Sequence, residues 1–140
     1  MSTELERRIK IAEDAVHAAF IQGSHELFIS GSTAINGVVS TDVDVVVYTD
    51  DFDYPINSWA CRCLVVSGWD VPANEYPVDL WISFKKNIDG VVVNILLCNS
   101  RAVYEQAAAA LAACKQLAAS GVTVDKQTRV AIHRDIMGDV

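Results

Sequence analysis

The stretch from Asp42 to Tyr48 reads Asp-Val-Asp-Val-Val-Val-Tyr, and it constrains the fold more than any other part of the chain. A run of β-branched and aromatic residues is typical of a strand inside a sheet. We therefore expect a strand over Val43–Tyr48 with two carboxylates at its beginning. Because side chains alternate along a strand, Asp42 and Asp44 project from one face, with backbones roughly 7 Å apart.

Two carboxylates on one face repel each other unless a cation lies between them. Oxygen ligands of this kind suit Mg²⁺ or Mn²⁺, and a pair of such ions is the arrangement used for phosphoryl transfer. The alternative is that Asp42 and Asp44 are loop or cap residues before a strand that begins at Val45.

A Gly-Ser doublet precedes this strand. We expect a short strand over Glu26–Ser30, then Gly31-Ser32, then a helical turn over residues 33–37. Glycine lets the backbone approach a phosphate, and Ser32 adds a hydroxyl donor to the same oxygens. Such doublets also occur in ordinary turns, but the strand-turn-helix-strand order favours a nucleotide site made by Gly31, Ser32, Asp42 and Asp44.

The remaining sequence divides into helices and a hairpin. Apolar spacing predicts helices over about residues 3–22, 55–66, 100–119 and 125–137, and strands over residues 78–84 and 91–98 joined by a hairpin turn at 85–90. We expect an α+β fold, in which a small mixed sheet of about four strands is covered by helices. At 140 residues the chain has the size of one domain, spanning 1–140.

The net charge of −7 argues against stable binding to nucleic acid, because that affinity comes from Lys and Arg. The four cysteines lack the spacing of a zinc site. The charged beginning is unlike a secretory signal, and no apolar run approaches the length of a membrane span. These features predict a cytoplasmic protein with reduced thiols.

A few cationic and aromatic side chains are candidates for nucleotide contacts. Lys85 and Lys86 lie in the expected hairpin turn, within reach of a triphosphate if the hairpin borders the site. Arg129 lies on the last helix, where it can meet a phosphate or an acidic partner. Trp81 or Phe84 can stack on a base. Solvated surface positions and core packing are the alternatives.

The spacing from Gly31-Ser32 to Asp42-Val43-Asp44 resembles the polymerase beta-like nucleotidyltransferase superfamily. The resemblance implies that the paired aspartates hold divalent metal, that the Gly-Ser turn holds nucleotide phosphates, and that a nucleoside monophosphate moves from a nucleoside triphosphate to an acceptor. The second half, from WISFKKNIDGVVVNILLC to DKQTRVAIHRDIMGD, is similar to small nucleotidyltransferase-like proteins of tailed phages.

The superfamily also places a third carboxylate on a later strand, where it binds the catalytic metal and accepts a proton. The best-placed strand here has Asn94, which can ligate a metal through its carbonyl oxygen but carries no charge and is no base. Asp79 also fits the pattern and would restore three carboxylates, although it can equally be a strand-start residue. If Asn94 faces the aspartates, nucleotide binding without transfer, or binding of a host protein, becomes the alternative function. A protein partner or a second copy of the chain is also a candidate for association.

Overall fold

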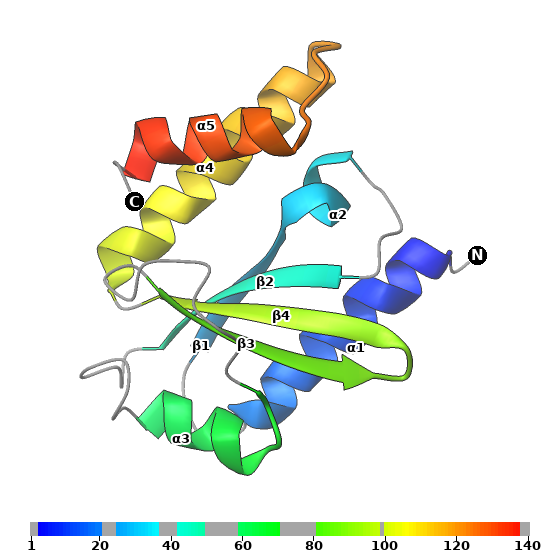
Figure 1. Ribbon diagram of the computed structural model, residues 1–140, viewed down its shortest axis with the longest axis vertical. Coiled ribbons are helices and arrows are strands. Elements are labelled where there is room, and N and C mark those ends of the chain that lie inside the picture. The colour runs from blue at the N-terminus through cyan, green and yellow to red at the C-terminus, as the bar shows by residue number, and fades with distance from the viewer. Residues whose placement is uncertain are drawn as a thin grey trace.

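The computed structural model describes residues 3–20, 25–36, 42–49, 59–70, 81–98 and 100–137. Figure 1 shows a sheet between two groups of helices. The elements in chain order are α1 (Glu4–Ala19), β1 (His25–Ser30), α2 (Gly31–Asn36), β2 (Asp42–Thr49), α3 (Trp59–Val66), β3 (Trp81–Ile88), β4 (Val91–Cys98), α4 (Arg101–Ala119) and α5 (Lys126–Met137). This is the predicted α+β class.

The four strands form one mixed sheet in the order β1-β2-β4-β3. β1 pairs with β2 and β3 pairs with β4 in antiparallel fashion, whereas β2 and β4 are parallel. The parallel pair lies at the centre of the sheet. It brings the Asp42–Thr49 strand directly beside the strand that contains Asn94.

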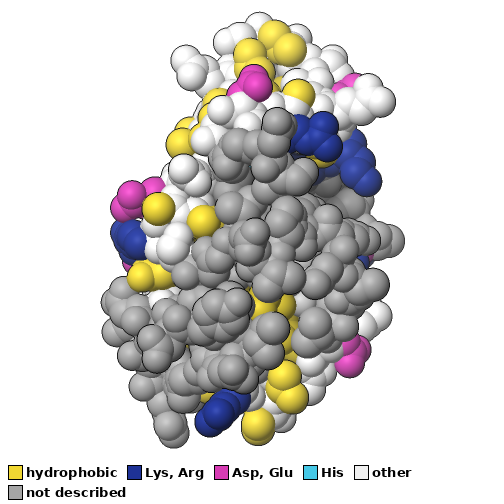
Figure 2. All heavy atoms as spheres, turned by 60° about the vertical axis from the view of Figure 1, so that its left-hand side comes forward, with side chains coloured by type: hydrophobic (Ala, Val, Ile, Leu, Met, Phe, Trp, Pro, Cys, Tyr) yellow, Lys and Arg dark blue, Asp and Glu magenta, His cyan; other side chains and the backbone are white. Residues whose placement is uncertain are grey.

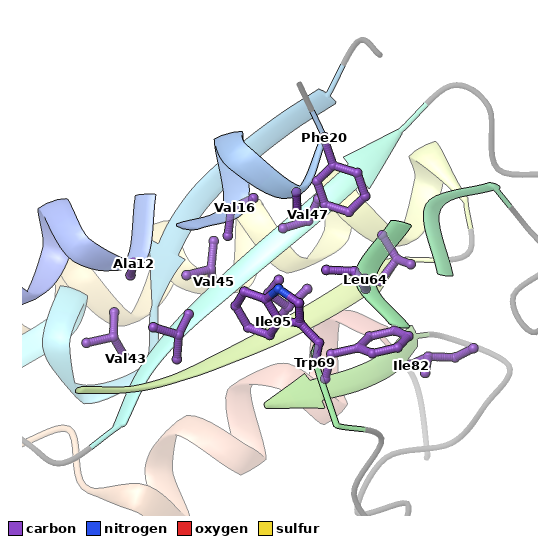
Figure 3. Packing of buried hydrophobic residues seen from close by; sticks show 14 of the residues in the cluster. Ala12, Val16, Phe20, Val43, Val45, Val47, Leu64, Trp69, Ile82 and Ile95 are labelled. Carbon is purple, nitrogen blue, oxygen red and sulfur yellow. The ribbon is translucent and has the colours of Figure 1, made fainter. Parts of the chain in front are cut away.

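The main core lies between the sheet and the pair α1 and α3. Alternate residues of the two central strands, among them Val43, Val45 and Ile95, point to this face, where α1 contributes Ala12 and Val16 (Figure 3). Because this side of β2 and β4 is aliphatic from Val43 to Val47 and from Val91 to Leu97, the sheet buries it against the apolar stripe of α1.

The opposite face of the sheet is covered in part by α4. Val46 and Leu96 pack there against Val103, Tyr104 and Ala107 of that helix. A third cluster joins α2 and α4 to the segment before α5 and to Ile132 of α5; its buried members are Ile35, Leu111, Cys114 and Val124. Asp42 and Asp44 project from this second face, because they alternate with the valines of the main core.

The helices begin where the sequence supplies capping side chains. Thr3 and Glu6 form a reciprocal capping box at α1, Ser100 Oγ accepts from Val103 N at α4, and Asp125 Oδ1 accepts from Thr128 N ahead of α5.

Within the described part of the chain, no helix has both the length and the apolar character needed to cross a membrane.

The hairpin between β3 and β4 is tighter than the sequence analysis predicted. The turn consists of Asp89 and Gly90, both with positive φ (52° and 83°), and β3 continues to Ile88. A two-residue turn of this kind matches the twist of the flanking strands, so pairing extends to the turn itself. Lys85 and Lys86 are therefore strand residues, and the prediction that they lie in the turn is wrong.

Two other predicted boundaries also differ. Asp42 is the first residue of β2, so the strand begins before Val45 and includes both aspartates. α2 begins at Gly31, earlier than the predicted turn over residues 33–37. The first parts of the predicted segments 55–66 and 78–84 lie outside the described residues.

Candidate functional site

One row of residues crosses all four strands on the face that carries the aspartates. Ser30 of β1 pairs with Asp44 of β2, Asp44 pairs with Asn94 of β4, and Asn94 pairs with Lys85 of β3. Residues that are directly opposite on neighbouring strands share a face, so these four side chains lie side by side. The row continues past β3, because Asp70 forms a two-bond backbone bridge with Lys85.

The backbone at Gly31 lies against the carboxylate of Asp44. Gly31 has φ of +66°, and a Cβ atom placed on it would lie 2.5 Å from Asp44 Oδ2. Both observations require glycine here, since a side chain would be strained and would collide with the carboxylate. The Gly-Ser turn and the second aspartate are therefore in contact, although Gly31 and Asp44 are thirteen positions apart in the sequence.

Asp44 is held from the other side by Asn94. The amide Nδ2 of Asn94 donates a hydrogen bond of 3.2 Å to Asp44 Oδ1. Burial raises the pKa of Asp44, the Asn94 hydrogen bond opposes that rise, and the charge of Asp42 adds to it; the cations Arg129 and Lys85 act in the lowering direction. The carboxylate thus lies where negative charge is disfavoured until positive charge arrives.

The orientation of Asn94 bears on how a metal can be bound. Its nitrogen faces Asp44, while its carbonyl oxygen Oδ1 is buried and accepts no hydrogen bond. A metal ligand must present oxygen toward the ion, so in this conformation Asn94 orients Asp44 rather than joining it as a ligand.

The described residues fit a single divalent cation better than a pair. Asp42 and Asp44 present carboxylate oxygens from one face of β2, which suits Mg²⁺ or Mn²⁺. Across the described ranges, no group of three His, Cys, Asp or Glu side chains gathers around one point. Asp79, the other candidate for a third carboxylate, lies outside those ranges.

The two neighbouring lysines have separate environments. Lys85 pairs with Asn94 on the aspartate face, and its charge acts to lower the pKa of Asp44. Lys86 points to the opposite face, where its Nζ donates to the Ser67 carbonyl at 2.7 Å and lies 6.0 Å from the Trp69 ring centroid. Of these two lysines, only Lys85 lies on the face of the site.

Arg129 of α5 acts electrostatically on the same site. Its charge acts to lower the pKa of Asp44, and its Nε is buried without a hydrogen-bond partner. A buried guanidinium nitrogen with no acceptor is costly, so this atom is suited to receive an anionic group. Figure 2 shows Lys and Arg side chains together on the upper half of the molecule, at the height of α4 and α5 in Figure 1.

Three further residues were candidates for nucleotide contacts: Ser32, Trp81 and Phe84. Ser32 is the second residue of α2, directly after Gly31, and its side chain is outside the described part, as is that of Trp81. Phe84 packs in the main core with 1% exposure, on the face away from Asp44, so for this residue the core-packing alternative holds and base stacking does not. Asp70 was missed, because a single bridging residue leaves no periodic signal in the sequence.

No protein-family model and no curated protein matches this sequence. Among solved structures, the chain is similar to terminal uridylyl transferase 4 from Trypanosoma brucei with bound CTP, with a TM-score of 0.50 and 16% identity, over 81% of this chain and 38% of that one. The same enzyme with bound UPU aligns with a TM-score of 0.41 and 17% identity, over 74% of this chain and 37% of that one. The chain spans well under half the length of that enzyme, and the first likeness shows a nucleotidyltransferase-like fold.

Proposed function

We propose that this protein binds a nucleoside triphosphate together with Mg²⁺ or Mn²⁺ and transfers the nucleoside monophosphate to a hydroxyl acceptor. The observation that carries the proposal is the approach of Gly31 to Asp44, where a Cβ would lie 2.5 Å from the carboxylate. It supports a site in which backbone and carboxylate enclose a metal-bound phosphate.

In this proposal Asp42 and Asp44 hold the divalent cation. Bound there, the cation would neutralise phosphate charge and polarise the phosphorus that is attacked. The raised pKa of Asp44 supports the assignment, because a carboxylate that is buried and close to Asp42 gains most from an added positive charge.

The phosphates are held by groups on three sides. The Gly31-Ser32 turn offers backbone N–H groups and a hydroxyl. Lys85 approaches from β3, and the unpaired Nε of Arg129 approaches from α5. Lys85 has no salt bridge among the described residues, so its ammonium is available for a phosphate.

Transfer also needs a group that accepts the proton of the acceptor hydroxyl. Asn94 cannot do so, because an amide is no base. We assign this role to Asp79, the other carboxylate that fits the superfamily pattern. In an Asp79→Asn variant transfer is slow, since the hydroxyl must lose its proton to water.

The direct test is release of pyrophosphate from each nucleoside triphosphate with Mg²⁺ or Mn²⁺ and a panel of hydroxyl acceptors. The proposal predicts metal-dependent release that is lost on Asp42→Ala or Asp44→Ala and reduced on Asp79→Asn. Absence of release with every nucleotide and acceptor would contradict transfer.

A second candidate function is nucleotide binding without transfer, in a protein that sequesters a nucleotide or presents it to a protein partner. The specific observation in its favour is the Asn94 amide, which donates to Asp44 at the position where a third carboxylate would stand. Calorimetry separates the two functions. Metal-dependent binding of a nucleotide that remains intact supports this candidate, and pyrophosphate release supports the first.

A further inference from the structure

A pair of histidines lies outside the site described above. His17 is in the last turn of α1 and is exposed, and His25 is the first residue of β1, the strand at one edge of the sheet. His17 Nδ1 and His25 Nε2 are 2.6 Å apart, and the ring centroids are 4.8 Å apart at an interplanar angle of 54°. Two imidazole nitrogens from different elements therefore face each other.

Facing nitrogens at this distance need a hydrogen atom or a metal ion between them, because two lone pairs or two N–H groups would repel each other. A shared proton satisfies the pair at 2.6 Å. A transition-metal ion satisfies it as well. With metal–nitrogen bonds of about 2.0–2.1 Å and tetrahedral angles, the two nitrogens would be about 3.3 Å apart. The rings would have to separate by roughly 0.7 Å, a small rotation for an exposed side chain.

We propose that His17 and His25 form a binding site for a divalent transition-metal ion that prefers imidazole, such as Zn²⁺, and that this ion ties the end of α1 to the start of β1. Each neutral ring carries one N–H, so ligation by both facing nitrogens requires a tautomer change in one ring and no net loss of protons. Two imidazoles leave the remaining coordination positions to water.

Two features of the surroundings, and the charge of the whole chain, support a cation at this point. The Phe20 ring lies 5.6 Å from the His25 ring and is itself fully buried, so it holds that imidazole in place. His17 lies at the C-terminal end of α1, where the helix dipole favours positive charge. The chain as a whole is acidic, with a net charge of −7, which raises the local concentration of cations.

The test uses the full chain with Asp42→Asn and Asp44→Asn, so that ions at the proposed nucleotide site do not contribute. Zn²⁺ is titrated while the ¹⁵N signals of the imidazoles are followed. The signals of His17 and His25 are expected to shift together, with a change to the metal-ligating tautomer. Those of His133, whose Nδ1 bonds the Arg129 carbonyl, should stay unchanged. Mg²⁺ is expected to shift none of them.

The matched variant is His17→Gln in the same background, which alters an exposed position on α1 and should leave the fold intact. We expect its Zn²⁺ affinity to fall by at least about tenfold. A Zn²⁺ affinity that is unchanged by His17→Gln, or a titration in which neither imidazole shifts, would overturn the proposal. Because the background lacks both site aspartates, either result is independent of the proposed nucleotide function.

Discussion

Asp44 and Asn94 are register partners on the central parallel strands, and the amide of Asn94 donates a 3.2 Å hydrogen bond to the carboxylate of Asp44. The backbone of Gly31 closes the other side of that carboxylate. Asp44 is thus fixed by two neighbours in a partly buried position. Its charge is disfavoured without a cation.

Removing the charge of Asp44 should stabilise the metal-free protein at neutral pH. Burial and the nearby Asp42 raise the pKa of Asp44, so the folded state binds this proton more tightly than the unfolded state. The stabilisation that comes from this proton is complete at a pH below the unfolded-state pKa of about 3.9. It is lost as the pH rises through the raised pKa of the folded state. At a pH above both pKa values, we expect Asp44→Asn to melt at a higher temperature than the parent.

The control for that measurement is Asp125, whose pKa is lowered mainly by hydrogen bonds from Thr128. The contribution of Asp125 to stability has the opposite pH dependence. It is present at neutral pH and is lost as the pH falls through the lowered pKa of the folded state. Asp125→Ala should therefore melt at a lower temperature than the parent at neutral pH and approach it in acid. If Asp44→Asn also destabilises the protein at neutral pH, the account of Asp44 is wrong.

Replacing Gly31 should damage both the fold and the site. Gly31→Ala forces an alanine into φ of +66° and places its Cβ 2.5 Å from Asp44 Oδ2. Gly121→Ala is the matched control, because Gly121 has φ of +88° with no atom within 4 Å of its added Cβ. The control should cost about 1 kcal/mol from backbone strain alone. Gly31→Ala should cost measurably more in chemical denaturation and should also weaken nucleotide binding; equal costs would contradict the close contact.

Asn94→Asp should convert the site toward one with three carboxylates. The new charge lies beside Asp44, so the metal-free variant should be less stable than the parent at neutral pH. Mg²⁺ should recover that loss and should raise the melting temperature of the variant more than that of the parent. Asn94→Ser, which adds no charge, serves as the control. A variant that gains nothing from Mg²⁺ would show that Asn94 does not border the metal position.

The two neighbouring lysines should have separable effects. Lys85→Met is expected to weaken nucleotide binding by roughly tenfold, the scale of one charge-assisted hydrogen bond to phosphate. Lys86→Met should leave binding unchanged and reduce stability, because Lys86 donates to Ser67 and covers Trp69 on the other face. Calorimetry and thermal melting on both variants test this assignment. Equal binding losses would contradict it.

The local part of the site could be predicted from the sequence. Gly31-Ser32 and Asp42-Val43-Asp44 lie within fourteen residues of one another, and the strand, turn and strand that hold them follow from local conformational preference. The alternation that puts both aspartates on one face needs no tertiary information.

The distant part could not be predicted in the same way. The pairing of Asp44 with Asn94 joins residues fifty positions apart and depends on how the chain crosses over to make β2 and β4 parallel.

The placement of Lys85 and Lys86 on opposite faces, in contrast, did have a local signal in the sequence. Asp89-Gly90 is a preferred two-residue hairpin turn, and placing the turn there would have put both lysines in β3 on opposite faces.

We propose that Asp44, Asp42 and Gly31 form a metal-dependent nucleotide site. Its most direct test is isothermal titration of each nucleoside triphosphate into the protein with and without Mg²⁺, for the parent and for Asp44→Asn. The account predicts binding of at least one nucleotide that requires Mg²⁺ and is lost in the variant. Binding that is the same without Mg²⁺ or in the variant, or no binding of any nucleoside triphosphate, would contradict it.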